Sequence, residues 1–223
     1  ALWVTDGERE SAEPHSLARI AEAVQRRPAH RRRFELRGDE PVLHPEFPDI
    51  FRAAREGGAR IVGIRTSGIY LCRAQVRKLL LSENIAEVGV DFALWLQGQL
   101  DDGHLAGVNQ ALKHLIRGGV QCHGVVNLSS REPPINWSRV RVLMNALELS
   151  SLRCEVRDAG PLEDAEAFFQ QLDLDARAMI HGGVLNLSIE GAPPCMYPEV
   201  GHHPFSPEAR PWRLRPRALD DIE

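Results

Sequence analysis

The stretch "ELRGDEPVLHPEFPDIFRAAREGGARIVGIRTSG", residues 35–68, decides the fold class. Its two ends are short apolar segments, which predict one strand at about 33–37 and another at 60–65. Between them we expect a helix at about 45–56, because apolar residues recur along one of its faces. These residues are Phe47, Ile50, Phe51 and Ala54. A strand, a helix and a second strand in this order predict a βαβ unit with parallel strands.

The same alternation continues along the rest of the chain. Further strands are predicted at 86–91, 120–128, 152–160 and 183–191. Helices are predicted from about Ser16 onward and at 73–82, 103–119, 136–150 and 161–172. The strands read as apolar on both faces, as in a sheet that helices cover or that closes into a barrel. The sequence therefore predicts an α/β fold, a partial (βα)6 TIM-like barrel whose open side would admit a peptide or another protein.

The chain begins with a loop and a helix, whereas a βα repeat begins with a strand. Losing that first strand would leave a sheet edge unpaired, which favours aggregation. Either a strand precedes Ala1 in the full protein or something else covers the edge. We expect residues 1–195 to form the barrel and residues 196–223 to form an irregular tail, a docking segment that could join two copies or two different chains.

The composition of the 223 residues narrows the possible functions. The net charge is −4, so a broad basic surface for nucleic acid is not expected. Neither a signal peptide nor an apolar run of membrane-spanning length is visible. The four cysteines are 50, 32 and 41 residues apart, which fits no zinc or disulfide pattern. These features favour a protein of the reducing cytoplasm.

Polar and glycine residues follow the predicted strands, at the ends where parallel α/β folds bind ligands. In chain order they are Gly38-Asp39-Glu40-Pro41, Arg65-Thr66-Ser67-Gly68, Asp91, Asn127, Arg157-Asp158 and Glu190-Gly191. Each one taken singly is equally compatible with an ordinary loop start. Taken together they predict a ring of hydrogen-bonding groups at one mouth of the barrel.

Several of these segments resemble the radical S-adenosylmethionine (radical SAM) superfamily. That family ends its second strand in Gly-Gly-Glu-Pro, where this chain has Gly38-Asp39-Glu40-Pro41, followed by a similar Leu43-His44-Pro45 turn. The family's Thr-Asn-Gly corresponds to Thr66-Ser67-Gly68. The segments "GVNQALKHLIRGGVQCHGVVN" and "SIEGAPPCMYP" are also similar to family segments, the second to those of peptide-modifying members. The resemblance spans roughly residues 5 to 198, with order and spacing kept.

The resemblance implies a binding site for S-adenosylmethionine. Residues 38–41 would bind its methionyl ammonium through backbone carbonyls and the Glu40 carboxylate. Asp39 replaces a glycine where the backbone approaches the ligand, so it would either crowd the ligand or help to hold the ammonium. Thr66 and Ser67 would complete this mouth. Asp91 and Asn127 would lie near the ribose and the methionyl carboxylate, and Arg157 near the carboxylate or the adenine.

The family's chemistry also needs a [4Fe–4S] cluster held by a Cys-x3-Cys-x2-Cys loop, and the chain contains no such motif. One explanation places the cysteines upstream of Ala1 together with the missing strand. The other holds that they have been lost, with Ala1 and Val4 marking an eroded end of the motif. Within the chain, Cys195 is a candidate cluster ligand and equally a loop thiol. The pair His202-His203 is better explained as an exposed tail feature than as a metal site.

Two functions follow from these alternatives. With upstream cysteines, the protein would be an enzyme that uses the cluster and S-adenosylmethionine to modify a substrate, which the "GAPPC" segment suggests to be a peptide. Without them, it would be a non-catalytic protein of the same fold that binds a peptide, S-adenosylmethionine or an active homologue. A third interpretation is an ordinary TIM-like barrel enzyme whose resemblance is accidental.

Overall fold

The computed structural model describes residues 21–22, 24–26, 33–37, 40–158, 167–168, 170–172, 174–175, 178–179, 186–192 and 213–216. The chain divides into two compact units. Unit 1 comprises Ala1–Asp91 and Asp101–Cys122, and unit 2 comprises Phe92–Leu100 and His123–Glu223. Both units combine parallel strands with helices, so the α/β class is confirmed.

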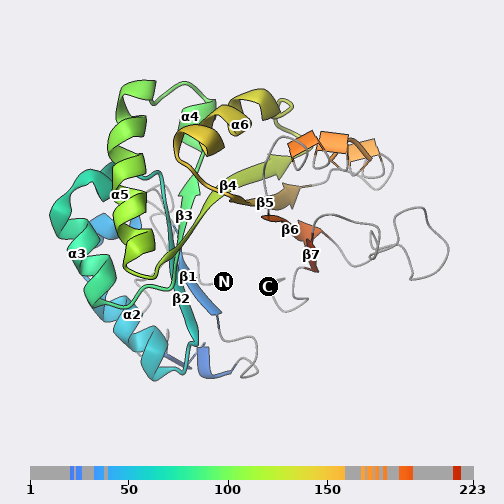
Figure 1. Cartoon of the computed structure of the whole chain (residues 1–223). Helices are drawn as coiled ribbons and strands as arrows, with labels where there is room; N and C mark the ends of the chain where they lie inside the picture. Colours follow the sequence, from blue (N-terminus) through green and yellow to red (C-terminus); the bar gives the residue numbers. More distant parts are fainter. Residues whose placement is uncertain are drawn as a thin grey trace. The chain divides into compact units, whose positions relative to one another are not determined.

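The described residues of unit 1 form the strands β1 (Arg33–Leu36), β2 (Ile61–Thr66) and β3 (Glu87–Asp91). They pair in parallel in the order β1-β2-β3. Helices α2 (Phe47–Glu56), α3 (Ala74–Ser82) and α5 (Leu105–Arg117) belong to the unit and lie along these strands in Figure 1. Short 3-10 turns precede them, namely η2 (Pro41–Leu43), η3 (Ile69–Cys72) and η4 (Asp102–His104). The strands and helices predicted between residues 33 and 119 are thus confirmed.

One face of the unit 1 strands is apolar and packs against helices. Its residues are Phe34, Leu36, Val62, Ile64, Val88 and Val90, all of them buried. The ring of Phe34 meets that of Phe51 on α2 edge-on, at 6.0 Å between centroids. Because side chains alternate along a strand, this face takes every second residue, and the helices remove it from water.

The opposite face of the same strands carries charged residues and glycines. They are Glu35 on β1, Gly63 and Arg65 on β2, and Glu87, Gly89 and Asp91 on β3. The register aligns Glu35 with Gly63 and Gly63 with Glu87, so these three positions form one row across the strands. The prediction that the strands are apolar on both faces is therefore wrong for this unit. We call this set of six residues the charged face.

Unit 2 contains α4 (Ala93–Leu96), α6 (Trp137–Ala146) and four parallel strands in the order β4-β5-β6-β7. The strands are β4 (Gln121–Ser129, whose first two residues belong to unit 1), β5 (Ser151–Asp158), β6 (Asn186–Ala192) and β7 (Arg213–Pro216). The first three confirm predicted strands. β7 lies inside the segment predicted to be irregular, so that prediction is wrong at these four residues.

Unit 2 repeats the division into an apolar and a charged face. Gly124 on β4 lies so close to α6 and Phe92 that an added Cβ would be 2.8 Å from both Met144 Sδ and Phe92 Cζ. The other face of β4 and β5 carries buried Arg153 and Glu155, and the register aligns Glu155 with Asn127. In the part of the chain that the structure describes, no helix combines the length and apolarity that crossing a bilayer requires.

Candidate functional site

Glu40 connects the segment at residues 38–41 to the segment at residues 65–68. The sequence predicts that these two segments meet at one mouth of the barrel. The Oε2 of Glu40 accepts a hydrogen bond from Thr66 Oγ1 at 2.7 Å. Its Oε1 accepts one from the Ser67 backbone N–H at 3.0 Å and another from the Ser67 hydroxyl. We call this set of three hydrogen bonds the Glu40 clamp. It ties the loop after β1 to the carboxyl end of β2.

Local backbone geometry aims these groups at one another. Pro41 opens the η2 turn, and Glu40 before it stays non-helical, with φ −143° and ψ 84°. On the other strand, Gly68 turns the chain from β2 into η3 with φ +91°, a conformation that favours glycine. The Gly68 N–H donates to Thr66 Oγ1 at 3.1 Å, which orients the hydroxyl that Glu40 accepts.

The clamp leaves Glu40 little capacity for a ligand. A carboxylate offers about four acceptor positions, two on each oxygen. Three protein donors already use the two oxygens of this half-buried side chain. Thr66 and Ser67, the residues that donate to it, are only 1% and 4% exposed. Glu40 therefore holds the loop in place first and has about one acceptor position left for a bound group.

Asp91 forms an ion pair at the next strand end. Its Oδ2 lies 3.6 Å from Nη1 of Arg65, a residue that is 3% exposed. A buried guanidinium needs an opposite charge nearby, because burial otherwise penalises the charged form. Asp91 thus offsets the charge of Arg65 and keeps its own carboxylate partly exposed to a ligand.

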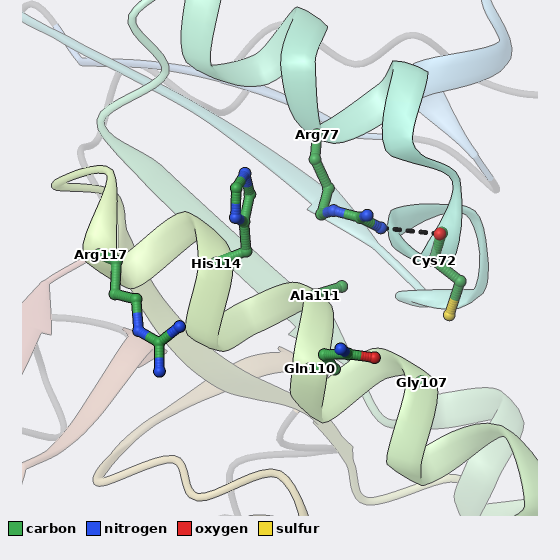
Figure 2. A pocket seen from close by; sticks show the side chains of 7 residues that line it. All are labelled: Cys72, Arg77, Gly107, Gln110, Ala111, His114 and Arg117. Atoms are coloured by element: carbon green, nitrogen blue, oxygen red, sulfur yellow. Dashed lines mark hydrogen bonds between the residues drawn. The ribbon is translucent and has the colours of Figure 1, made fainter.

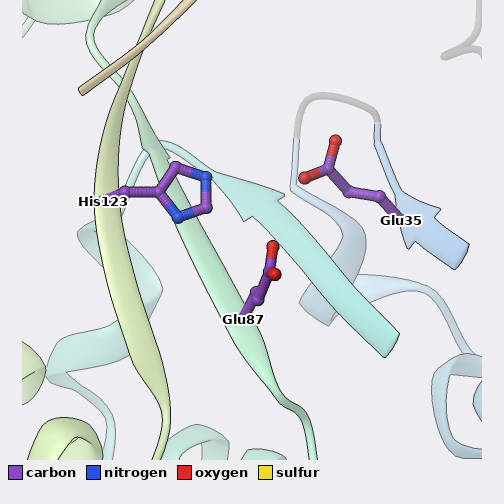
Figure 3. A group of neighbouring side chains, drawn as sticks. All are labelled: Glu35, Glu87 and His123. Carbon is purple, nitrogen blue, oxygen red and sulfur yellow. The ribbon is translucent and has the colours of Figure 1, made fainter. Parts of the chain in front are cut away.

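The charged face brings two further carboxylates together, and sequence reasoning missed them. Carboxylate oxygens of Glu35 and Glu87 lie within 4.8 Å of each other, on either side of Gly63 in the register. Figure 3 draws both side chains, together with His123, which belongs to unit 2. A Cβ on Gly63 would stand 3.2 Å from the Glu87 carbonyl oxygen, so glycine suits this crowded row. Arg37 forms an ion pair with Glu35 at 2.6 Å.

The structure does not place the remaining predicted site residues relative to Glu40. Asn127 is half-buried on β4 in unit 2. Arg157 lies on β5, but its side chain is outside the described residues, as are Gly38, Asp39, Cys195 and the His202-His203 pair. The structure therefore brings together Glu40, Pro41, Thr66 and Ser67 and places Asp91 on the neighbouring strand.

The three described cysteines do not form a thiolate set. Cys72 is exposed at the end of η3, Cys122 is half-buried, and Cys154 is buried on β5. Burial raises the pKa of Cys122 to about 12. Burial, and secondarily the Glu155 charge, raises the pKa of Cys154. A cluster needs three thiolates around one centre, so these cysteines do not fit a [4Fe–4S] cluster.

A scan against models of known protein families matches none of them to this chain. A search of curated proteins finds no match either. The function is therefore inferred from the residues themselves.

Proposed function

We propose that this chain is a radical SAM-type protein that binds S-adenosylmethionine at the carboxyl ends of β1, β2 and β3. The observation that carries the proposal is the Glu40 clamp, which unites the Gly-Asp-Glu-Pro segment with the Thr-Ser-Gly segment. The two segments are separate in the sequence, and direct hydrogen bonds join them in space. Ligands of parallel α/β folds bind at this end of the strands.

The chemistry of this mouth suits the methionyl end of the ligand. An ammonium group binds to carbonyl and carboxylate acceptors, and its hydrogen bonds are stronger when the acceptor is charged. Glu40 retains about one acceptor position, and Asp91, whose side chain is 19% exposed, adds a second carboxylate on the adjacent strand.

The enzyme form of the proposal needs cluster ligands other than the cysteines described here. Cys72, Cys122 and Cys154 do not fit a cluster, so in this form three other thiolates would have to hold it. The alternative is a non-catalytic protein that keeps the fold to bind S-adenosylmethionine, a peptide or an active homologue. In both forms the residues at the carboxyl ends of β1, β2 and β3 have the same role: they bind and orient the ligand and exclude water from it.

Binding of S-adenosylmethionine to the purified chain tests the proposal directly. We expect calorimetry to detect binding and the Glu40→Gln variant to bind about tenfold more weakly, because an amide cannot accept all three hydrogen bonds of the clamp. Glu46→Gln is the matched control, since Glu46 is an exposed residue just before α2. Absence of binding to the wild-type chain would overturn the proposal.

Anaerobic reconstitution separates the two forms. The full-length protein with its natural N-terminus is incubated with iron and sulfide, and its visible absorption and the cleavage of S-adenosylmethionine are measured. Cluster absorption together with cleavage supports the enzyme. Ligand binding without either one supports the non-catalytic protein.

A further inference from the structure

A pocket of about 230 Å³ lies in unit 1 between η3, α3 and α5. Cys72 and Arg77 form one wall, and residues of α5 form the other (Figure 2). The α5 residues are Gly107, Gln110, Ala111, His114 and Arg117. They follow one another at helical spacing, so a single stripe of α5 faces the pocket.

The lining of the pocket is basic. Arg77 and Arg117 carry positive charges, His114 adds an imidazole, and none of the seven lining residues is acidic. Within the described part of the chain, the side chains of Gln110, His114 and Arg117 form no hydrogen bond or ion pair. Arginines elsewhere in unit 1 do pair with carboxylates. Examples are Arg26 with Glu22, Arg52 with Asp49 and Arg55 with Glu83.

Arg77 is held in position by the backbone. Its Nη1 donates to the carbonyl oxygens of Leu71 and Cys72, both at 2.7 Å. Its Nε and Nη2 therefore remain as donors on a guanidinium that is already oriented. Across the pocket, a Cβ on Gly107 would lie 3.0 Å from Cys72 Sγ, so glycine lets the thiol reach this wall.

We propose that this pocket binds a small phosphate ester. Guanidinium groups form bidentate, charge-assisted hydrogen bonds with phosphate oxygens, and the Gln110 amide can donate to further oxygens. The volume of about 230 Å³ is below the range of about 300–1,000 Å³ typical for drug-sized ligands, but it is several times that of a water molecule, about 30 Å³. A phosphate with a small attached group matches that space. The proposal is independent of S-adenosylmethionine binding.

Calorimetry on the full chain tests the proposal with three probes: inorganic phosphate, a hexose phosphate and the neutral hexose. We expect the hexose phosphate to bind more tightly than inorganic phosphate, and the hexose alone not to bind. Arg117→Gln and His114→Ala should each weaken ester binding about tenfold, since the first removes the guanidinium charge and the second removes the imidazole donor. Arg141→Gln, an exposed arginine on α6, should leave binding unchanged.

Cys72 provides a readout at the pocket itself. It is exposed and lines the pocket, so a bound ester should slow its alkylation by iodoacetamide, as followed by peptide mass spectrometry. That protection should be lost in Arg117→Gln. Binding that leaves Cys72 alkylation unchanged would place the ligand elsewhere and overturn the proposal. Equal affinity for inorganic phosphate and the ester, or no binding of either, would overturn it as well.

Discussion

At the scale of single residues, Glu40 shows how a motif residue can serve the fold before it serves a ligand. The sequence resemblance predicts that Glu40, the residue before Pro41, presents acceptors to an ammonium group. The structure gives it Thr66 and Ser67 as partners, because its non-helical backbone directs the side chain toward the adjacent strand end. Parallel pairing predicts that the two strand ends meet. The individual hydrogen bonds depend on side-chain geometry that no sequence pattern specifies.

Gly68 carries a prediction at this scale. Substituting Gly68→Ala forces alanine to φ +91° and brings its Cβ to 3.0 Å from Val108 Cγ1 and 3.4 Å from Val90 Cγ1. We expect a loss of about 2–4 kcal/mol in the free energy of unfolding, from backbone strain and overpacking together. Urea unfolding of the wild type and the variant measures the loss.

Gly98 provides the matched control, because it also has a positive φ, +72°, but its Cβ would find no atom within 4 Å. Gly98→Ala should therefore cost only about 1–2 kcal/mol, the strain alone. Equal losses in the two variants would mean that the contacts of the added Cβ with Val90 and Val108 contribute nothing to the loss of stability at position 68.

At the scale of elements, hydrophobic periodicity located the helices and strands well but misjudged the faces of the strands. β2 reads as continuously apolar because Ile61, Val62 and Ile64 lie close together in sequence. The period-2 pattern nevertheless places Gly63 and Arg65 together on the opposite face. Glu35 and Glu87 belong to that face as well, and the alternation of charged residues within β1 and β3 was the available sign of it. Their alignment across Gly63 depends on register, which a strand's own sequence does not determine.

The α5 helix gives a second prediction. Its inward stripe includes Leu112, which is 0% exposed, whereas Ile116 on the same helix is 47% exposed. Leu112→Ala should lower the free energy of unfolding by about 2–5 kcal/mol, because it leaves a cavity in a packed interior. Ile116→Ala should change it by at most about 1 kcal/mol, since little buried area is lost. Thermal or urea unfolding compares the two variants, and similar losses would contradict this assignment of the inward face.

At the scale of the whole molecule, both units are built on one design, with an apolar face under helices and a charged face opposite. Arg153 and Glu155 in unit 2 correspond in kind to Arg65 and Asp91 in unit 1. The alternation of strands and helices predicted the parallel pairing within each unit. It did not predict β7, because a four-residue strand gains its stability from pairing with β6 across a long connection rather than from its own pattern.

The burial of two thiols, Cys122 in unit 1 and Cys154 in unit 2, predicts how the free energy of unfolding depends on pH. The pKa of Cys122 is raised to about 12, and burial also raises that of Cys154. An unfolded thiol ionises at about pH 8.5. Above that pH the unfolded chain releases protons that the folded chain keeps, so ionisation favours unfolding. The contribution of each thiol is therefore fully present below about pH 8.5 and is lost as the pH rises toward the folded pKa.

The predicted slope is large enough to measure. Once an unfolded thiol is ionised and its folded counterpart is not, each pH unit costs about 1.4 kcal/mol of unfolding free energy per thiol. Cys154→Ala should therefore lose stability less steeply than the wild type in urea unfolding under reducing conditions at several alkaline pH values. The cavity left by Cys154→Ala lowers the free energy of unfolding by the same amount at every pH. The slope of that free energy against pH therefore still reports the ionisation of the thiol. Cys72→Ser, which alters an exposed thiol, should keep the wild-type slope. If Cys154→Ala keeps it too, Cys154 does not stay protonated in the folded molecule.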